Sequence, residues 1–352
     1  MANLGCADEY KIGVFDRTGS RQLGELFDAS ALTWGRVVDD TSDAVVQVPY
    51  QGADCCGLLA DAWPWCNEIV LVRDDLLVWQ GPVETITYGR EVTTITAKDV
   101  TAWLYHRVIK DLIDYSAAGA GPADLVLIAE ALVRHGLDQD DPNVLQYLHT
   151  KLAGVTGERR YPANGSIVYD ELAELARTGV DFTALGRRII IAGEVPVARL
   201  PQLADEHFVG DLQVVKDGRQ AATAATVVGK GVTATAGGIG PCGLLETLAN
   251  EQEILDDISA QAEAVSIVQA GTFPVMLQVP DGAQLDPDAP VSINELIPGV
   301  VIPVTSSETC YTLSADLRLQ RLQVTFDAGN GSDDGGGEQV RVTLVPVGAQ
   351  FE

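Results

Sequence analysis

The sequence is poor in basic residues and in aromatic residues. Its 352 residues include 23 Lys and Arg against 50 Asp and Glu, which gives a formal net charge of −27. Binding to nucleic-acid phosphates needs clustered Lys and Arg, so this balance argues against a nucleic-acid-binding protein. It also disfavours an anionic membrane surface. The simplest explanation of the charge is that it keeps the molecules apart in solution.

The sequence also lacks long apolar runs and a recognisable leader. No run approaches the length of a membrane-spanning helix, so no membrane insertion is expected. The start, Met1 to Cys6, lacks the basic residues and apolar stretch of a secretory signal, and synthesis in the cytoplasm is therefore expected. Structural disulfides are rare there, so no disulfide is expected, with late oxidation of one pair outside the cell as the alternative, and Cys55, Cys56 and Cys66 are expected to be buried free thiols. The six cysteines are Cys6, Cys55, Cys56, Cys66, Cys242 and Cys310.

No combination of residues typical of a catalytic or metal site is present. Cys55, Cys56 and Cys66 lack C-x-x-C spacing and a nearby histidine. None of the four histidines accompanies a G-x-S-x-G motif or a catalytic-looking cysteine, and His106 is expected to pack or cap. Carboxylates are too numerous for one acid/base pair to stand out. We therefore expect no enzyme activity, no cofactor and no metal.

Three further segments have a functional and a structural interpretation. Gly238–Gly243 fits G-x-G-x-x-G, but Pro241 removes one donor and no βαβ unit surrounds it, so a connection is favoured over a phosphate site. Trp63-Pro64-Trp65 is the one candidate for carbohydrate binding, and is equally compatible with a buried anchor. Asp333, Asp334 and Glu338 border a Gly-rich hairpin tip, where flexibility is favoured over cation binding.

What the sequence has in quantity is β-strand pattern, most clearly between Glu68 and Arg107. Val, Ile, Leu, Thr and Trp dominate three segments there. The predicted strands are Glu68–Arg73, Leu76–Tyr88 and Glu91–Lys98. Tight turns are predicted at Asp74-Asp75 and at Gly89-Arg90, the second of type II′. Gly81-Pro82 predicts an edge position or a bulge, because proline has no N–H to donate to a ladder.

The rest of the chain divides into β regions and helical segments. Strands and turns are predicted from Tyr10 to Pro49, a loop from Tyr50 to Asn67, and β structure again from Leu203. Helices are predicted where apolar residues recur at 3–4 spacing. They are a helix capped by Asp99, one beginning near Pro122, one capped by Ser166 and ended by Gly179, and a long one over Leu244–Gln269 that packs on its own domain or on a neighbouring subunit. Asp217-Gly218 predicts a hairpin.

Several short motifs, in this order along the chain, resemble minor tail proteins that form the tail-tip hub of long-tailed actinobacteriophages. They are W-Q-G-P-V from Trp79, T-A-K-D-V-T-A-W from Thr96, Y-D-E-L-A-E-L-A from Tyr169, G-L-L-E from Gly243 and E-L-I-P-G from Glu295. The resemblance extends from about Tyr10 to Pro346. The positions matching the motifs, all with expected structural roles, are Trp79, Gly81, Pro82, Asp99, Trp103, Gly179, Gly243, Glu246, Pro298 and Gly299.

This resemblance implies an α+β, mostly β fold with two small β-barrel-like domains. It places the first barrel at 1–105, an inserted α/β domain at 106–202, the second barrel at 203–238 and 290–352, and a helical connecting domain at 239–289. It also implies a homotrimer at the distal end of the virion tail that closes the tail tube and opens for DNA ejection. The implied partners are the distal tail protein, the tape measure protein and other tip or fibre proteins.

An acidic wall in such a lumen would repel phosphate and let DNA slip past without specific binding. Two other functions remain alternatives at this point. The first is a host-surface carbohydrate-binding adhesin, and the second is a cell-wall hydrolase.

Overall fold

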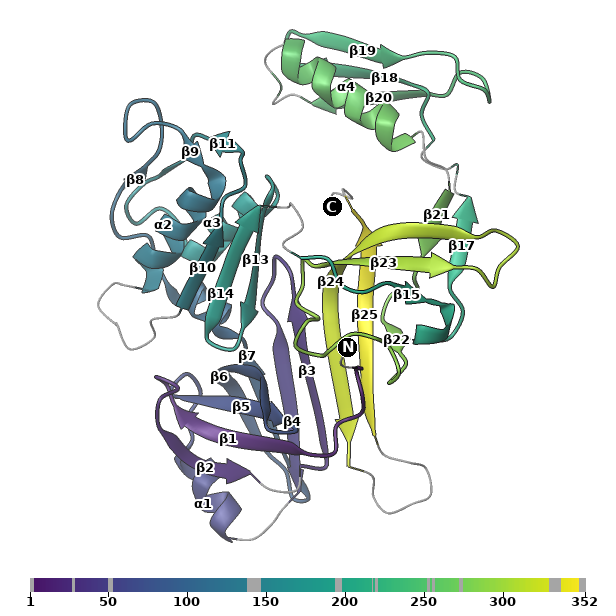
Figure 1. Cartoon of the computed structure of the whole chain (residues 1–352). Helices are drawn as coiled ribbons and strands as arrows, with labels where there is room; N and C mark the ends of the chain where they lie inside the picture. The colour runs from purple at the N-terminus through teal and green to yellow at the C-terminus, as the bar shows by residue number, and fades with distance from the viewer. Residues whose placement is uncertain are drawn as a thin grey trace. The chain divides into compact units, whose positions relative to one another are not determined.

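The computed structural model describes most of the chain (Figure 1). The described residues are 3–26, 29–49, 53–137, 147–193, 198–216, 218, 221–251, 254, 257–271, 275–328 and 337–347. They form two compact units. The first comprises Met1–Asp211, Val279–Thr305 and Asp316–Glu352, and the second comprises Leu212–Gln278 and Ser306–Ala315. The fold is α+β and mostly β, as the sequence predicted.

A 13-stranded sheet forms the frame of the first unit, with the order β16-β22-β25-β24-β3-β4-β7-β6-β5-β1-β2 and β23 and β15 off this path. Its early strands are β1 Tyr10–Asp16, β2 Gln22–Leu26, β3 Ala31–Val37, β4 Asp43–Pro49, β5 Asn67–Arg73, β6 Leu76–Tyr88 and β7 Val92–Lys98. Its later strands are β15 Leu203–Ala204, β16 Phe208–Val209, β22 Ala283–Leu285, β23 Val301–Ser306, β24 Leu313–Asp327 and β25 Glu338–Pro346. Side chains alternate between the core and the outside along β3 and β4, as a half-buried sheet requires.

One ladder joins the two ends of the sequence. β3 pairs antiparallel with β24, from Ala31 opposite Asp327 to Val37 opposite Arg321. Figure 1 shows these strands side by side, one purple and one yellow-green. The early and late β regions are therefore two halves of one continuous sheet.

The predicted meander is confirmed, with β6 at the predicted bounds. The first half of β6 pairs with β5 and the second half with β7, and the register shifts between Val83 and Thr85, next to Pro82. Gly81 lies at this change of partner. A Cβ added there would come 1.8 Å from the Lys98 carbonyl oxygen, so only glycine fits without moving the backbone.

Of the two tight turns predicted in the meander, the first is confirmed and the type of the second is wrong. Asp74 and Asp75 both have positive φ, as a tight two-residue turn requires. Gly89 does not have positive φ, and its N–H donates to the Val92 carbonyl, so the type II′ prediction is wrong. The predicted loop before the meander instead contains helix α1, Ala53–Asp61, whose Leu59 is buried.

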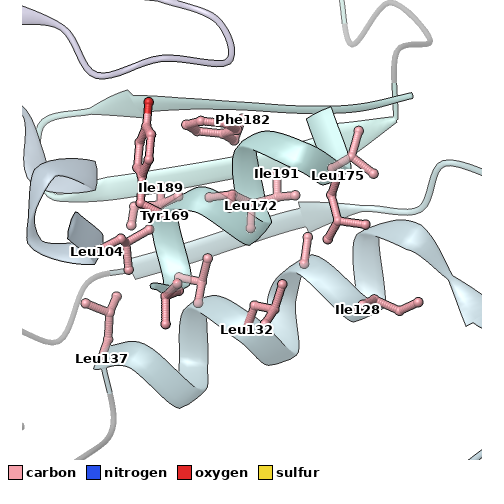
Figure 2. Packing of buried hydrophobic residues seen from close by; sticks show 14 of the residues in the cluster. Leu104, Ile128, Leu132, Leu137, Tyr169, Leu172, Leu175, Phe182, Ile189 and Ile191 are labelled. Carbon is pink, nitrogen blue, oxygen red and sulfur yellow. The ribbon is translucent and has the colours of Figure 1, made fainter. Parts of the chain in front are cut away.

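Between the two halves, an α/β insertion packs two helices on a three-stranded sheet. The helices are α2 Leu125–Leu137 and α3 Val168–Ala176, and the sheet order is β10 Tyr147–Lys151, β14 Arg188–Gly193, β13 Val180–Leu185. Two small strand pairs border them, β8 Ile113–Asp114 with β12 Arg160–Tyr161 and β9 Ala123–Asp124 with β11 Thr156–Gly157. Figure 2 shows the core between the layers, with Ile128, Leu132, Leu172, Leu175, Phe182, Ile189 and Ile191 converging.

The helix boundaries here differ from the predictions in two places. The helix after Asp99 is a 3₁₀ helix, η1 Val100–His106, and Asp99 caps it as predicted. Ser166 does not cap α3, because Ile167 occupies the N-cap position and makes no side-chain bond. The Val168 N–H is instead satisfied by the Arg107 carbonyl at the end of η1, so a neighbouring segment supplies the cap.

The second unit contains two small sheets and a helix. β17 Gln213–Lys216 pairs with β21 Val275–Gln278, so the hairpin predicted at Asp217-Gly218 is wrong, and Asp217 itself lies outside the described residues. The other sheet has the order β19-β18-β20, formed by Thr233–Gly237, Ala224–Gly229 and Glu246–Glu251.

Helix α4, Asp257–Gly271, packs on this sheet through Ala260 and Ala264. The helix predicted over Leu244–Gln269 is thus confirmed from Asp257 on and wrong for its first third, which pairs with β18 as a strand. None of the helices in the described ranges is long and apolar enough to span a bilayer.

We expect Gly81→Ala to lower the free energy of unfolding by about 3 kcal/mol or more, because a backbone oxygen cannot rotate away from the added Cβ. Urea unfolding followed by circular dichroism measures it. Gly57→Ala is the matched control, since Gly57 lies in α1 with nothing within 4 Å of an added Cβ. That control is expected to stabilise by about 0.5–1 kcal/mol. Equal effects of the two substitutions would contradict this account of β6.

Candidate functional site

Five of the ten motif residues meet at one corner of the first unit. They are Trp79, Gly81, Pro82, Asp99 and Trp103. Asp99 is 3% exposed and organises the corner. Its Oδ2 accepts from the Ser42 backbone N–H and hydroxyl, both at 2.6 Å, and its Oδ1 accepts from the Thr101 N–H at 2.9 Å and hydroxyl at 2.5 Å. The Ser42 hydroxyl accepts in turn from Trp79 Nε1 at 3.4 Å.

This corner is built for support and not for chemistry. Burial raises the pKa of Asp99, while the four donors from Ser42 and Thr101 act in the opposite direction. Those donors use the lone-pair sites that a carboxylate offers, so Asp99 has none left for a substrate. Trp103 packs edge-on against Trp65 with ring centroids 5.3 Å apart, and Trp65 packs against His106 at 4.4 Å. His106 thus packs, as predicted.

The other five motif residues lie elsewhere. Gly179 follows α3 with φ +98°, and Gly299 has φ +97°, so both occupy backbone conformations that favour glycine. Pro298-Gly299 belongs to a loop beside Arg36. Gly243, with φ +101°, and the exposed Glu246 belong to the second unit.

Arg36 shows how that loop is held. This side chain is 1% exposed and has carbonyl partners: Nη1 donates to Ile293 at 3.0 Å and Leu296 at 3.2 Å, and Nη2 donates to Val78 at 2.8 Å. Its guanidinium also lies over the Trp34 ring, 5.2 Å from the centroid. One buried cation therefore joins β3, β6 and the loop that carries the E-L-I-P-G motif.

A buried ion pair joins β5 to β25. Arg73 Nη2 lies 2.6 Å from Glu338 Oε2, and Arg73 Nε donates to Glu338 Oε1 at 2.9 Å, with the two side chains 7% and 1% exposed. Tyr10 Oη donates to Oε1 at 2.5 Å, and the Ala7 N–H donates to Oε2 at 3.0 Å. Glu338 is thus fully occupied, and the alternative that it binds a cation is wrong. Asp333 and Asp334 lie outside the described residues.

The insertion is attached to the large sheet by polar contacts to the β3–β4 turn. The Asp39 N–H donates to the Phe182 carbonyl at 2.8 Å, and the Phe182 N–H donates back to Asp39 Oδ1 at 2.9 Å. The Thr183 hydroxyl donates to the Val37 carbonyl at 2.7 Å, and Tyr169 Oη donates to Asp40 at 2.9 Å. Arg318 of β24 forms a buried ion pair with Asp181 of β13. These bonds tie the insertion to both halves of the sheet.

A second buried carboxylate, Glu68, lies where the insertion meets β5 and β6. Its Oε2 accepts from Arg187 Nη1 and from Gln80 Nε2, each at 2.8 Å, while Oε1 has no hydrogen-bond partner. Burial raises the pKa of Glu68 to about 7, and the Arg187 charge offsets it only in part. Gly19 covers the site so closely that an added Cβ would come 2.3 Å from Arg187 Nη1. Glu68 lacks a nucleophile or a histidine among these contacts.

An open cavity of about 490 Å³ lies beside this contact. Leu76, Leu77, Gln80, Leu185, Gly186, Arg187, Arg188 and Asn294 line it. Its lining combines three leucines and a glycine with Gln80, Asn294 and two arginines, and contains no acid/base pair. The cavity therefore offers a binding surface and no catalytic arrangement.

The histidines and cysteines do not assemble a reactive centre. His135 Nε2 accepts from the Lys110 N–H, His207 Nδ1 accepts from the Ala204 N–H, and His149 is exposed on β10. Within the part of the chain that the structure describes, no three His, Cys, Asp or Glu side chains come close enough to hold a metal ion.

Four cysteines are exposed free thiols, so the burial predicted for Cys66 is wrong. They are Cys6, Cys66, Cys242 and Cys310. Each lies outside the helices and strands, where a small apolar side chain gains little core contact. The side chains of Cys55 and Cys56 lie outside the described residues.

Two segments singled out in the sequence take structural roles. In the G-x-G-x-x-G segment, Gly240 and Gly243 exchange backbone hydrogen bonds in a tight turn, which leads into strand β20 and not into the helix that the sequence predicted. The preceding strand β19 is antiparallel to β18, so the segment is a connection, as predicted. Trp63 is 66% exposed while the Trp65 ring is packed, so the pair does not present two exposed rings for a sugar.

Glu338→Gln is expected to lower the free energy of unfolding by about 3 kcal/mol, because the buried Arg73 would keep only its longer contact to Asp74, 3.6 Å from Nη1 to Oδ2. Asp316→Asn is the matched control. Asp316 pairs with Arg199 at 2.6 Å, but the side chains are 43% and 60% exposed, so the expected loss is about 1 kcal/mol or less. Chemical denaturation at pH 7 measures both, and similar losses would contradict the assigned weight of the buried pair.

Glu68 should make stability fall as pH rises. Its pKa is raised to about 7 by burial, so the folded state holds a proton that the unfolded state releases near pH 4.5. This stabilisation is complete below pH 4.5 and is lost as pH rises through about 7, with a size of about 3 kcal/mol. Glu68→Gln should remove that dependence. Urea unfolding of both proteins at pH 5 and pH 8 measures it, and parallel pH profiles would contradict the assignment.

No protein-family profile matches the sequence. No curated protein matches it either. Solved structures do match, over nearly the whole chain. The 43 kDa tail protein of prophage MuSo2 from Shewanella oneidensis superposes with a TM-score of 0.61 at 15% identity, covering 96% of this chain and 98% of that one.

Two further structures give the same result. The prophage tail protein gp18 from Listeria monocytogenes gives a TM-score of 0.58 at 10% identity, with 95% and 94% covered. The tail protein from Neisseria meningitidis gives 0.57 at 12% identity, with 95% and 96% covered. The chain thus shares, over at least 95% of its length, the fold of three tail proteins, two of them from prophages.

Proposed function

We propose that this chain is a structural component of a phage tail, and that it forms the central hub of the tail tip. The observation that carries the proposal is the likeness in fold, which covers at least 94% of each of the three tail proteins. A likeness over nearly the whole of both chains supports this proposal more than one shared domain would.

The sequence motifs support the hub over other tail components. The motifs resemble those of tail-tip hub proteins in the same order, and five of the matching residues pack into one corner around Asp99. We propose the division that the resemblance implies, with barrels at 1–105 and at 203–238 with 290–352, the insertion at 106–202 and the connection at 239–289. The ten motif residues then serve the architecture.

In this proposal three copies close the tail tube. The two β halves of each chain would present six similar faces to the distal tail protein above, while the tape measure protein and other tip or fibre proteins bind elsewhere. The role is mechanical, since the hub plugs the tube and opens for DNA ejection. A net charge of −27 suits a wall past which DNA must slide without binding.

An assembly role also agrees with what the polar side chains do. The buried carboxylates Asp99, Glu338 and Glu68 all bond to neighbouring segments of the same chain. A cell-wall hydrolase would need a pair of carboxyl groups open to the glycan. We therefore propose no enzymatic step.

Electron cryo-microscopy of the purified chain tests the proposal. The expected result is a ring of three copies with six related β faces and an axial bore lined mainly by Asp and Glu. A neutral or basic bore would remove the electrostatic argument while leaving the ring. A particle with one copy or with twofold symmetry would contradict the hub.

A further inference from the structure

The second unit has an open three-stranded sheet, and among the residues that the structure describes no strand pairs with either of its edges. β18 lies in the middle, β19 and β20 form the edges, and α4 packs along one face (Figure 1). β20 is six residues long and contains no proline, lysine or bulge, and its two charged residues, Glu246 and Glu251, lie at its ends, so its centre lacks the usual protections of an edge strand. Its Leu248 is 63% exposed. Such an edge is a template for another strand.

The hydrogen bonds to β18 determine which backbone groups of β20 point away from the sheet. β20 runs parallel to β18, and the Ala224 N–H donates to the Leu245 carbonyl at 3.0 Å. In a parallel ladder alternate residues bond to the neighbour, so residues 245, 247, 249 and 251 point toward β18. The backbone groups of Glu246, Leu248 and Asn250 therefore point away from the sheet.

The hydrogen bonds to β18 likewise determine which backbone groups of β19 point away from the sheet. β19 runs antiparallel to β18, and the ladder is fixed by bonds from the Gly229 N–H to the Val232 carbonyl and from the Gly238 N–H to the Thr223 carbonyl. The outward residues are consequently Thr233, Thr235 and Gly237. The Thr235 carbonyl accepts one bond from Gln261 Nε2 at 3.3 Å, which leaves its second lone pair.

The backbone groups that point away from the sheet on β19 and on β20 lie opposite the same three residues of β18. Thr226 of β18 is opposite both Thr235 and Leu248. In the same way, Val228 is opposite Thr233 and Asn250, and Ala224 is opposite Gly237 and Glu246. β19 and β20 also run in opposite directions. Placed side by side, they would form three hydrogen-bonded antiparallel pairs without a change in either strand.

We propose that β20 of one copy pairs with β19 of the next copy, in a head-to-tail contact that closes around the threefold axis. This inference rests on the trimer proposed above and names the strands that would join its subunits. A heterologous contact of this kind generates a ring when its rotation closes.

The charged residues at the ends of β20 are compatible with this pairing of β20 and β19. Glu251 at the end of β20 is level with Gly229, and the exposed Lys230 follows Gly229 on the turn into β19. The Lys230 of the same chain therefore lies one strand away from Glu251, and the next copy would bring a second Lys230 to the other side of Glu251. Thr233, Thr235 and Gly237 carry no charge, so no like charges would face Glu246. A twofold β20–β20 contact would place Leu248 opposite itself and leave both β19 edges unpaired.

Disulfide trapping tests the pairing. In one chain Thr235 and Leu248 are separated by β18, two strand spacings or about 9.5 Å apart, too far for a disulfide. Across the proposed contact they are a directly opposed pair at about 5.5 Å between Cα atoms. The double variant T235C/L248C is made with the four exposed native cysteines changed to serine, and is mildly oxidised. T235C and L248C alone are the controls.

The expected product is a covalent species of three chains of 37.4 kDa from the double variant only, seen on a non-reducing gel. A covalent dimer from L248C alone would overturn the proposal in favour of the twofold contact. An untreated protein that sediments as a trimer, with no trapping in the double variant, would overturn this contact and leave the hub intact. A monomeric untreated protein would overturn both.

Hydrogen exchange on the unmodified protein gives a second measurement. In the free edge only the inward amides of β20, such as Thr247, are protected. The proposed contact should also slow exchange at the amides of Glu246, Leu248 and Asn250 by at least tenfold. Fast exchange at these three in a trimeric sample would overturn the proposal.

Discussion

The buried ion pair between Arg73 and Glu338 is the contact on which the frame of the first unit depends. It joins residues 265 apart in sequence and leaves no acceptor on Glu338 free, because Tyr10 and Ala7 donate to the same carboxylate. Taking two charges out of water is costly unless every bond is made, so this pair specifies one arrangement of β5 and β25. With the β3–β24 ladder, it makes the two β halves one sheet. The insertion then rests on a rigid support through Asp39 and Arg318.

Sequence reasoning succeeded where the cause was local. Strand β6 and the cap by Asp99 were predicted correctly, since period-2 patterns and a carboxylate two residues before an N–H are visible in a short window. It failed where a distant segment decided the outcome. The segment after Gly243 has apolar spacing compatible with a helix, but β18 recruits Glu246–Glu251 as a strand. The partner of Glu338 could not be predicted, because nothing near it in sequence indicates Arg73.

For the candidate site, the sequence identified some of the residues but not the contacts that explain them. The motif W-Q-G-P identified Gly81, whose requirement for glycine is explained by the Lys98 carbonyl only in three dimensions. Glu68, Arg36 and the free edge of β20 carry no motif, and the signal for each is a contact or its absence across the fold. The same contacts explain why a carboxylate-rich chain forms no catalytic pair among the buried groups described here. The buried polar side chains described above join segments of the chain, which agrees with the proposed structural role.

The measurement that tests the central claim most directly is antibody-gold labelling of whole phage particles, with serum raised against this chain and electron microscopy as the readout. The account predicts gold confined to the distal end of the tail, both on intact particles and on particles with disrupted tips. Gold on the capsid or along the tail shaft would contradict the hub. Absence of gold even from disrupted tips would contradict a place in the virion.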